Sequence, residues 1–185
     1  MDVLIDVSGV TITTGRLILR PLTLADAQDF YAYASVPGVG EMAGWKHHES
    51  TDESKAILRS MMEGKEVLAL VHKADQKVIG TLGLHPSWAN EAEAYRQYRV
   101  KEIGYVLSKD YWGQGLMPEA VGAVIAYCFD TLGLDALTCC HFTENGQSRR
   151  VIEKCGFRFV RTGEFVSERL HKTFEDKQYI LIRNM

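Results

Sequence analysis

A glycine-containing loop that joins a strand-like segment to a helix-like segment constrains this sequence more than any other feature. Residues 100–107 alternate as a strand does, residues 118–130 carry a wide apolar helical stripe, and Gly113 and Gly115 stand between them. Pro118 suits a first helical turn because it lacks an N–H. The free N–H groups and the dipole of a helix start attract anions, and glycine lets the backbone approach phosphate oxygens closely. The pattern predicts an anion site, with a tight turn that binds no ligand as the alternative.

The spacing within this loop argues against two kinds of nucleotide site. A dinucleotide fingerprint has a third glycine where Pro118 stands, and a mononucleotide loop needs a Gly-Lys-Ser/Thr sequence, which is absent. We therefore do not expect a nucleotide-binding protein of either type.

Composition limits the remaining classes. The chain has 185 residues, 46% of them hydrophobic and 24% charged, which is typical of a globular protein. At about 100–200 residues per domain, this length predicts one domain over residues 1–185. The net charge is −3, from 21 Lys and Arg against 24 Asp and Glu, so the basic excess of nucleic-acid binders is missing. We expect no nucleic-acid partner.

The cysteines and the N-terminal segment predict a cytoplasmic protein. No C-x-x-C spacing occurs, and two of the four cysteines are adjacent, which favours small buried residues in a reducing compartment. The cysteines are Cys128, Cys139, Cys140 and Cys155. The first ten residues carry two aspartates and no basic region, unlike a signal peptide, and no run of 18 apolar residues predicts a membrane span.

Apolar periodicity and turn residues predict a mixed sheet with helices on its faces. Strands are expected at 17–19, 67–71, 77–84, 100–107, 134–142, 157–169 and 173–183. Helices are expected at 23–34, 50–64, 118–130 and 147–154, and a mobile loop at 37–50. The buried face of the second helix is expected to comprise Ala56, Ile57, Ser60 and Met61. This order of elements belongs to the α/β (α+β) class, because meander strands come first and helix-linked strands follow.

Three blocks of sequence together resemble one protein family. Tyr111–Ala120 has the sequence YWGQGLMPEA, Asn145–Phe157 has NGQSRRVIEKCGF, and Arg16–Leu22 has RLILRPL. They resemble, respectively, the acetyl-CoA pyrophosphate loop, the Asn-x-x-Ser helix and the first strand of the Gcn5-related N-acetyltransferases, in particular the ribosomal-protein N-terminal acetyltransferases. The resemblance spans residues 14–183. It implies a bent, mixed sheet of six or seven strands with about four helices, whose fourth and fifth strands splay apart around the pantetheine arm.

The loop departs from the usual family pattern at two positions. The pattern is Gln/Arg-x-x-Gly-x-Gly/Ala, and here Trp112 stands first and Met117 last, while Gly115 keeps the central glycine. A tryptophan at the first position is common in the ribosomal-protein branch. Met117 still presents the backbone N–H that a phosphate needs.

The resemblance implies which residues bind acetyl-CoA as the acetyl donor. The backbone of Trp112, Gly113, Gln114, Gly115, Leu116 and Met117 is expected to bind the pyrophosphate. The backbone of Tyr105, Val106 and Leu107 is expected to pair with the pantetheine amides. Asn145 is expected to bond the pantetheine arm, with a plain helix cap as its alternative, and Ser148 is expected near the thioester sulfur.

The implied reaction is acetyl transfer to a primary amine by direct attack in a ternary complex. It needs a base to accept a proton and an acid to protonate the thiolate. Ser148 is the candidate acid. Glu102 is the candidate base, with an edge-strand carboxylate facing water as its alternative. Glu164 and Glu168 lie near the position of the branch's own glutamate but at no evident match.

Several other residues are open candidates. His47 and His48 are expected as an exposed loop pair, and no metal site is expected because no third ligand has a suitable spacing. His85 and His141 end strands on the expected cofactor side and titrate near neutral pH.

The acceptor and the assembly are predicted only broadly. The acceptor is a protein N-terminus or a small amine, and a homodimer is plausible through the long last hairpin. The alternative function is a non-catalytic acyl-CoA-binding module of the same fold.

Overall fold

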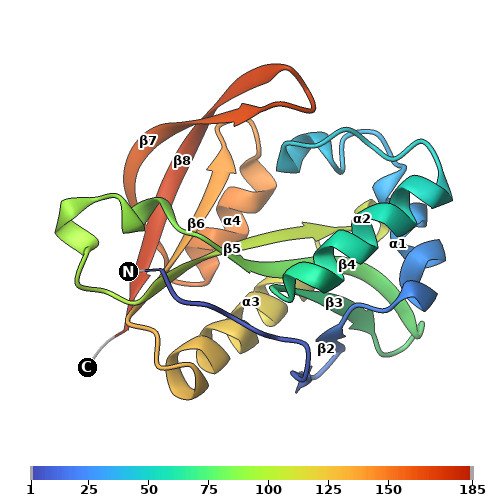
Figure 1. The fold of residues 1–185 in the computed structure, drawn as a ribbon, viewed down its shortest axis with the longest axis horizontal. Helices are drawn as coiled ribbons and strands as arrows, with labels where there is room; N and C mark the ends of the chain where they lie inside the picture. The colour runs from blue at the N-terminus through green and yellow to red at the C-terminus, as the bar shows by residue number, and fades with distance from the viewer. Residues whose placement is uncertain (1, 184–185) are drawn as a thin grey trace.

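The computed structural model describes residues 2–183 and consists of one open sheet with α-helices on both faces (Figure 1). The strands are β1 (Ile12–Thr13), β2 (Leu17–Pro21), β3 (Val67–His72), β4 (Lys77–His85), β5 (Val100–Leu107), β6 (Ala136–Phe142), β7 (Arg158–Ser167) and β8 (Lys172–Ile182). The α-helices are α1 (Ala27–Ala34), α2 (Thr51–Gly64), α3 (Leu116–Ala126) and α4 (Gly146–Lys154). Short 3-10 turns are η1 (Leu24–Asp26), η2 (Glu41–Ala43), η3 (Trp88–Asn90), η4 (Glu93–Tyr95) and η5 (Lys109–Tyr111), and a π-helical turn, η6 (Tyr127–Thr131), extends α3.

The sheet has the strand order β1-β2-β3-β4-β5-β6-β8-β7. Every neighbouring pair is antiparallel except β5 and β6, which are parallel. These two strands pair only at Val100–Glu102 with Ala136–Thr138, although both continue beyond that point. The sheet is therefore split near its middle, where β5 and β6 diverge.

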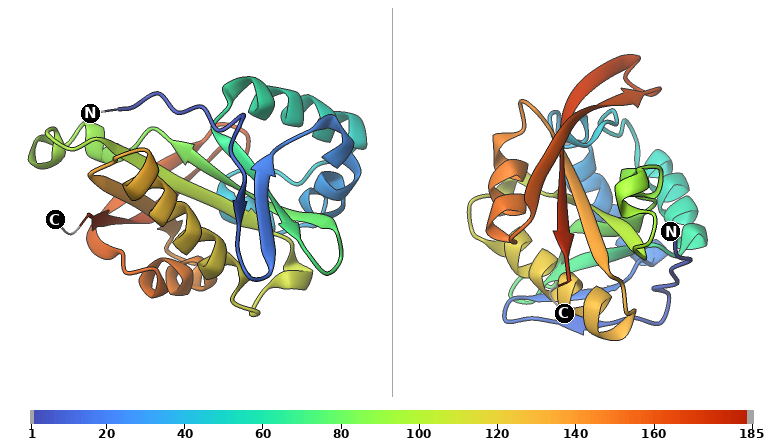
Figure 2. Two further views of the ribbon diagram at one scale, coloured as in Figure 1. Left: turned by 90° about the horizontal axis from the view of Figure 1, so that it is seen from below. Right: turned by 90° about the vertical axis from the view of Figure 1, so that its left-hand side faces the viewer.

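The two faces of the sheet carry separate cores. Helix α3 packs on the face that presents Leu70, Leu82 and Ile103, and α1 and α2 cover the face that presents Ala69 and Val71. Figure 2 shows α3 and α4 together on one side and the β7–β8 hairpin projecting from the sheet. Gly80 on β4 leaves room for the carbonyl of Val106 on β5, because a Cβ there would lie 2.3 Å from that oxygen.

The expected fold class is confirmed, with small changes in element boundaries. The structure adds the two-residue edge strand β1 to the seven expected strands. The third helix begins at Leu116 rather than at Pro118, because Gly115 adopts a left-handed conformation and caps the helix. Pro118 still lies in the first turn, where its missing N–H costs no hydrogen bond.

The expected buried face of α2 is partly wrong. Ser54 and Leu58 are the buried residues, and Ile57 and Met61 are half-buried. Ala56 and Ser60 are exposed, because the helix turns the 54–58–61 stripe toward α1 and the sheet.

The segment expected as a mobile loop over residues 37–50 contains ordered structure. It includes η2, and His48, expected to be exposed, is 3% exposed. The His48 ring packs against Phe30 and Trp45, and its Nδ1 lies 2.7 Å from Ser54 Oγ. Its packing shows that His48 is a core residue of the α1–α2 layer.

Candidate functional site

The divergence of β5 from β6 leaves backbone groups of β5 facing a gap. Ser108 N–H donates to the carbonyl of Ile79 on β4. This bond identifies which residues of β5 direct their backbone N–H and C=O groups toward β4. Because successive residues of an antiparallel strand face opposite neighbours, Val106 bonds toward β4, while Tyr105 and Leu107 face the gap. The Leu107 carbonyl accepts a bond of 2.8 Å from Trp112 Nε1. Of the three strand residues expected to pair with pantetheine, two therefore direct their backbone into the gap.

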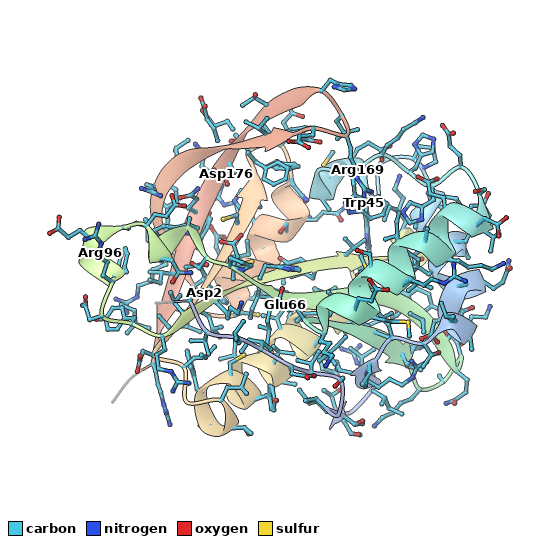
Figure 3. The ribbon with its side chains drawn as sticks, viewed as in Figure 1. Asp2, Trp45, Glu66, Arg96, Arg169 and Asp176 are labelled. Carbon is cyan, nitrogen blue, oxygen red and sulfur yellow. The ribbon has the colours of Figure 1, made fainter. Side chains whose placement is uncertain are left out.

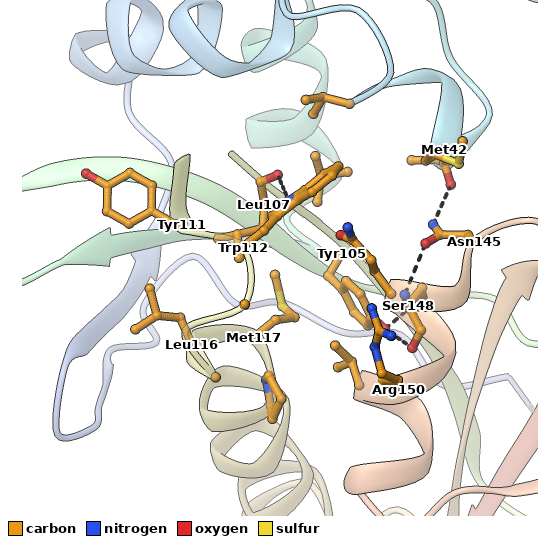
Figure 4. A pocket seen from close by; sticks show the side chains of 18 of the residues that line it. Met42, Tyr105, Leu107, Tyr111, Trp112, Leu116, Met117, Asn145, Ser148 and Arg150 are labelled. Atoms are coloured by element: carbon orange, nitrogen blue, oxygen red, sulfur yellow. Dashed lines mark hydrogen bonds between the residues drawn. The ribbon is translucent and has the colours of Figure 1, made fainter. Parts of the chain in front are cut away.

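The loop after β5 ends in the helix start that the sequence predicts. Gly113 and Gly115 both have a φ of 74°, a left-handed conformation that favours glycine. Gly115 is the N-cap of α3, and Glu119 N–H donates the first intrahelical bond to its carbonyl, at 3.3 Å. The N–H groups of Leu116 and Met117 have no partner within the helix, and both residues line the same cavity as Trp112 (Figure 4).

An arginine from the start of β2 braces this loop. Arg16 Nη1 donates to the carbonyl of Gln114 at 2.8 Å, and its Nε lies 2.7 Å from Glu119 Oε2. Thr14 also donates to Glu119, at 2.6 Å. A carboxylate in the first turn of α3 would repel an anion bound there, and Arg16 neutralises it. The Gln114 side chain does not line the cavity.

Helix α4 closes the other side of the gap. Asn145 caps it, since Asn145 Oδ1 accepts from Ser148 N–H at 3.0 Å, and Asn145 Nδ2 donates to the carbonyl of Met42 at 3.4 Å. Ser148 Oγ lies 2.9 Å from Tyr105 Oη, as Figure 4 shows. Burial raises the pKa of Tyr105 well above its ordinary value, so its hydroxyl keeps its proton. Sequence reasoning assigned Tyr105 a backbone role only and missed its hydroxyl.

A first cavity of about 370 Å³ runs along these elements. Apart from Gln114, every residue expected to bind the cofactor lines it: Tyr105, Val106, Leu107, Trp112, Gly113, Gly115, Leu116, Met117, Asn145 and Ser148. Arg150 and Lys154 line it as well, one helical turn apart on α4. The sequence analysis missed this basic pair, although its i, i+4 spacing after Ser148 was a signal for one helical face.

A second cavity, of about 190 Å³, adjoins the first. Tyr105, Asn145 and Ser148 line both, as do Met42 and Ala43 of η2. The second cavity is also lined by Glu102, Ile103, Gly104, Cys139, Cys140, His141, Phe142, Phe165 and Asp176. The hydroxyls of Tyr105 and Ser148 therefore lie where a ligand of the first cavity would meet a ligand of the second.

Glu102 lies on a central strand, so it is not the edge-strand carboxylate of the alternative reading. Its Oε2 accepts from Thr138 Oγ1 at 3.0 Å and from Cys140 Sγ at 3.4 Å. Burial raises the pKa of Glu102, and the nearby charge of Asp176 raises it further, while the two hydrogen bonds act in the opposite direction. A raised pKa makes this carboxylate a better proton acceptor.

The other sequence candidates lie outside the two cavities or have structural partners. Glu164 and Glu168 are exposed on and after β7 and line neither cavity. His47 Nδ1 lies 2.7 Å from Glu41 Oε1, and His85 lies over Gly83 and Gly104, 3.9 Å from Glu66.

His141 lines the second cavity and lies 3.2 Å from Tyr179 Oη. Within residues 2–183, no three His, Cys, Asp or Glu side chains are grouped to hold a metal ion. No helix in that range is long and apolar enough to cross a membrane.

Comparisons with known proteins agree with this geometry. The sequence profile described as an acetyltransferase (GNAT) domain matches residues 16–158. The uncharacterized N-acetyltransferase YoaA of Bacillus subtilis (strain 168) is 30% identical over 150 residues, covering 78% of this chain and 81% of that protein.

Two solved structures resemble this one in fold. The crystal structure of the Microcin C7 self immunity acetyltransferase MccE, in complex with acetyl-CoA and AMP, has a TM-score of 0.75 at 15% identity, over 92% of this chain and 94% of that chain. The ribosomal-protein-S5-alanine acetyltransferase from Vibrio fischeri has a TM-score of 0.69 at 18% identity, over 94% and 96%.

Proposed function

Because the chain belongs to the GNAT acetyltransferases, which transfer an acetyl group from acetyl-CoA to an amine, we propose that a primary amine attacks the thioester directly in a ternary complex. The observation that carries this proposal is the junction of two cavities at Tyr105, Asn145 and Ser148. One cavity has an anion-binding helix start, and the other has a buried carboxyl. Two substrates bound in them meet without a covalent enzyme intermediate.

The first cavity suits acetyl-CoA in three ways. The N–H groups from Gly113 to Met117 would hold the pyrophosphate, and Arg150 and Lys154 add positive charge beside it. The Trp112 N–H, expected to take part, donates instead to the carbonyl of Lys109 at 3.1 Å. The gap-facing backbone of Tyr105 and Leu107 would pair with the pantetheine amides as a neighbouring strand does. Acetyl-CoA supplies the activated acyl carbon.

The second cavity supplies the proton acceptor in this proposal. As the C–N bond forms and the C–S bond breaks, the amine loses a proton to Glu102, directly or through one water. The departing thiolate gains a proton from the Ser148 and Tyr105 hydroxyls, which lie 2.9 Å apart, and water returns the proton held by Glu102 to this pair after the reaction. Proton loss and proton gain balance on opposite sides of the reacting carbon.

The finer identity of the acceptor is a protein N-terminus or a small amine. The name of the Vibrio fischeri neighbour, a ribosomal-protein-S5-alanine acetyltransferase, supports the first. The small volume of the second cavity, about 190 Å³, admits only the end of a chain or a small molecule.

The proposal is tested by acetyl transfer to a panel of peptides and small amines, followed as free thiol and as acetylated product by mass spectrometry. We expect transfer from acetyl-CoA, and a raised melting temperature when acetyl-CoA binds. Binding of acetyl-CoA without transfer to any acceptor would favour a non-catalytic acyl-CoA-binding module. Absence of binding would contradict the assignment of the first cavity.

We also propose a cytoplasmic location, a homodimer and a single domain over residues 1–185. All four cysteines are free thiols, which a reducing compartment maintains. Strand β7 lies at the sheet edge and exposes Phe159, Phe165 and Val166, so a second copy could cover it. Cell fractionation tests the cytoplasmic location. Sedimentation of the wild type against Val166→Lys tests the homodimer, and a single cooperative unfolding transition tests the single domain.

A further inference from the structure

The second cavity contains a buried carboxylate with no cationic partner. Asp176, labelled in Figure 3, lies on β8 and is 5% exposed. Its oxygens accept only long bonds from Gln178 Nε2, at 3.3 and 3.4 Å, and no ion pair involves Asp176 within residues 2–183. A carboxylate removed from water needs a cation or strong donors to offset the loss of hydration. Asp176 therefore lines the cavity with unused capacity to bind a cation.

The surrounding side chains hold Asp176 in this position. Gln178 Oε1 accepts from Arg161 Nε at 2.8 Å, which turns the Gln178 amide N–H toward Asp176. Arg161 is itself occupied, because its guanidinium lies 4.7 Å over the Trp88 ring. On the neighbouring strand, Gly163 leaves the space, since a Cβ there would lie 2.6 Å from Asp176 Oδ1.

Asp176 and Glu102 lie on the same face of the sheet. Glu102 is opposite Thr138, and Asp176 is opposite Phe142, so both carboxylates flank β6 on the face that the cavity opens to. Strands on either side of a third are about 10 Å apart, and Phe142 lies about 13 Å beyond Thr138 along β6, so the two residues are diagonal to one another across β6. Both side chains line the same cavity, and the charge of Asp176 raises the pKa of Glu102. Asp176 can therefore contact an acceptor amine whose proton reaches Glu102 through water.

The rest of the cavity wall combines apolar side chains with a few neutral polar ones, and His141 is its only basic side chain among the described residues. Met42 of η2, Phe142 and Phe165 line it, and Phe142 stacks on Phe174 at 4.2 Å. Lys and Arg are absent from the lining formed by the described residues. A ligand carboxylate bound here would meet two like charges and no counter-ion.

We propose that Asp176 binds the acceptor as its ammonium, which loses one proton to water before the neutral amine attacks, and that the second cavity selects primary amines with an apolar body and no carboxylate on the carbon that bears the amine. This inference rests on the proposed function, since it names the acceptor class of the same site. A peptide N-terminus and an amino-acid amide both satisfy it, whereas a free α-amino acid does not.

The test compares leucinamide with leucine, which differ in whether an amide or a carboxylate stands beside the amine. Calorimetry measures their binding to the protein saturated with CoA, which has no acetyl group to transfer. We expect leucine to bind at least about tenfold more weakly than leucinamide, because it adds a like charge to the cavity. Equal affinities would overturn the inference.

Substitution of Asp176 locates the effect. Asp176→Asn is expected to weaken leucinamide binding about tenfold, because the carboxylate that binds its ammonium is lost. The ratio of the leucinamide affinity to the leucine affinity should also fall, because one of the two carboxylates that repel the leucine carboxylate is gone. Glu175→Gln, at the neighbouring exposed residue on the opposite face of β8, is the matched control and should leave both affinities unchanged. Identical behaviour of the two variants would refute the role of Asp176.

Two further measurements keep this inference distinct from the proposed function. If Asp176→Asn does not fold, Gly163→Ala replaces it, because its Cβ would lie 2.2 Å from Gln178 Nε2 and 2.6 Å from Asp176 Oδ1. It therefore displaces both the Asp176 carboxylate and the amide that holds it, which should also weaken leucinamide binding. Unchanged binding by a folded Gly163→Ala variant would contradict the proposal. Selective leucinamide binding without acetyl transfer would contradict the proposed reaction but support the amine site at Asp176. Acetyl transfer without selectivity between leucinamide and leucine would support the reaction but contradict the amine site.

Discussion

The hydroxyls of Tyr105 and Ser148 lie 2.9 Å apart and join β5 to α4 across the gap in the sheet. Tyr105 also donates to the Ser148 carbonyl, at 3.3 Å, so the tyrosine is held by two contacts on one residue. Both residues line both cavities. The pair therefore lies where the two cavities meet.

The first prediction concerns this pair as a proton donor. Ser148→Ala should lower kcat about 10- to 100-fold with little change in the KM for acetyl-CoA, since the hydroxyl acts on the leaving thiolate. Tyr105→Phe should lower kcat by less. Steady-state kinetics of both single variants and the double variant measure the coupling, and we expect the effects to be non-additive. Strictly additive effects would show that the hydroxyls act independently.

The second prediction concerns the pH dependence of kcat/KM. Glu102 must be ionised to accept a proton, so activity should rise with pH through its pKa, which burial raises above the ordinary 4.5. Glu102→Gln should abolish this limb and lower kcat about 10²- to 10⁴-fold. Asp176→Asn should move the limb to lower pH because it removes a nearby negative charge. An unchanged limb in Glu102→Gln, against the exposed control Glu164→Gln, would transfer the role of base to another group.

The third prediction concerns the loop before α3. Gly115→Val forces a β-branched residue into a φ of 74°, which costs about 1–3 kcal/mol and distorts the N–H groups of the loop. We expect the Kd for acetyl-CoA to rise at least about tenfold. Gly122→Ala is the control, because its Cβ meets no atom within 4 Å and favours the helix by about 0.5–1 kcal/mol. Isothermal titration of both variants decides, and equal affinities would contradict the loop assignment.

The fourth prediction concerns the basic pair on α4. Arg150→Ala and Lys154→Ala should each raise the KM for acetyl-CoA several-fold and reduce the salt dependence of its binding, because each removes a charge from the first cavity. Arg149→Ala is the control, since Arg149 is exposed, pairs with Glu153 at 2.8 Å and does not line the cavity. A similar KM for all three variants would indicate that the backbone alone holds the phosphates.

The fifth prediction concerns acid stability of the first helix. Burial opposes ionisation of Asp26, but bonds from Arg20 at 2.7 and 2.9 Å and from Thr23 N–H outweigh it and lower the pKa of Asp26. The stabilisation is therefore present above the unfolded-state pKa and is lost as pH falls through the lower folded value.

Asp26→Asn should cost about 1–3 kcal/mol of unfolding free energy at neutral pH and flatten its decline below about pH 4. Urea denaturation at several pH values measures this, with the exposed Asp52→Asn as a control that should leave the transition unchanged. An unaltered pH profile for Asp26→Asn would assign the acid sensitivity to other carboxyls.

Features determined by neighbouring residues could be predicted from the sequence. The loop at 112–117 and the cap at Asn145 depend on residues within one turn, so their positions follow from glycine and asparagine chemistry. Family membership and the mixed sheet could also be predicted, because several short patterns occur in the right order along the chain. Both predictions are confirmed.

Features that depend on distant contacts could not be predicted. Lys101 is 1% exposed and pairs with Glu66 at 3.1 Å and Asp2 at 3.2 Å. The alternation of polar and apolar residues along β5 does not indicate either of these partners. The place of Asp176 in the same cavity as Glu102 follows from the pairing of β8 with β6, which links residues far apart in the chain. Burial of His48 depends in the same way on partners from two helices.

The short seam between β5 and β6 has a consequence for how such a protein can diverge. In the proposed function the donor is held chiefly by main-chain groups exposed where the strands part, and side-chain mutation leaves those groups in place. The cavity proposed for the acceptor owes its character to side chains, among them Met42, Phe165 and Asp176. Lineages built on this sheet can therefore inherit the same donor through topology while exchanging one acceptor for another by single substitutions in the second cavity.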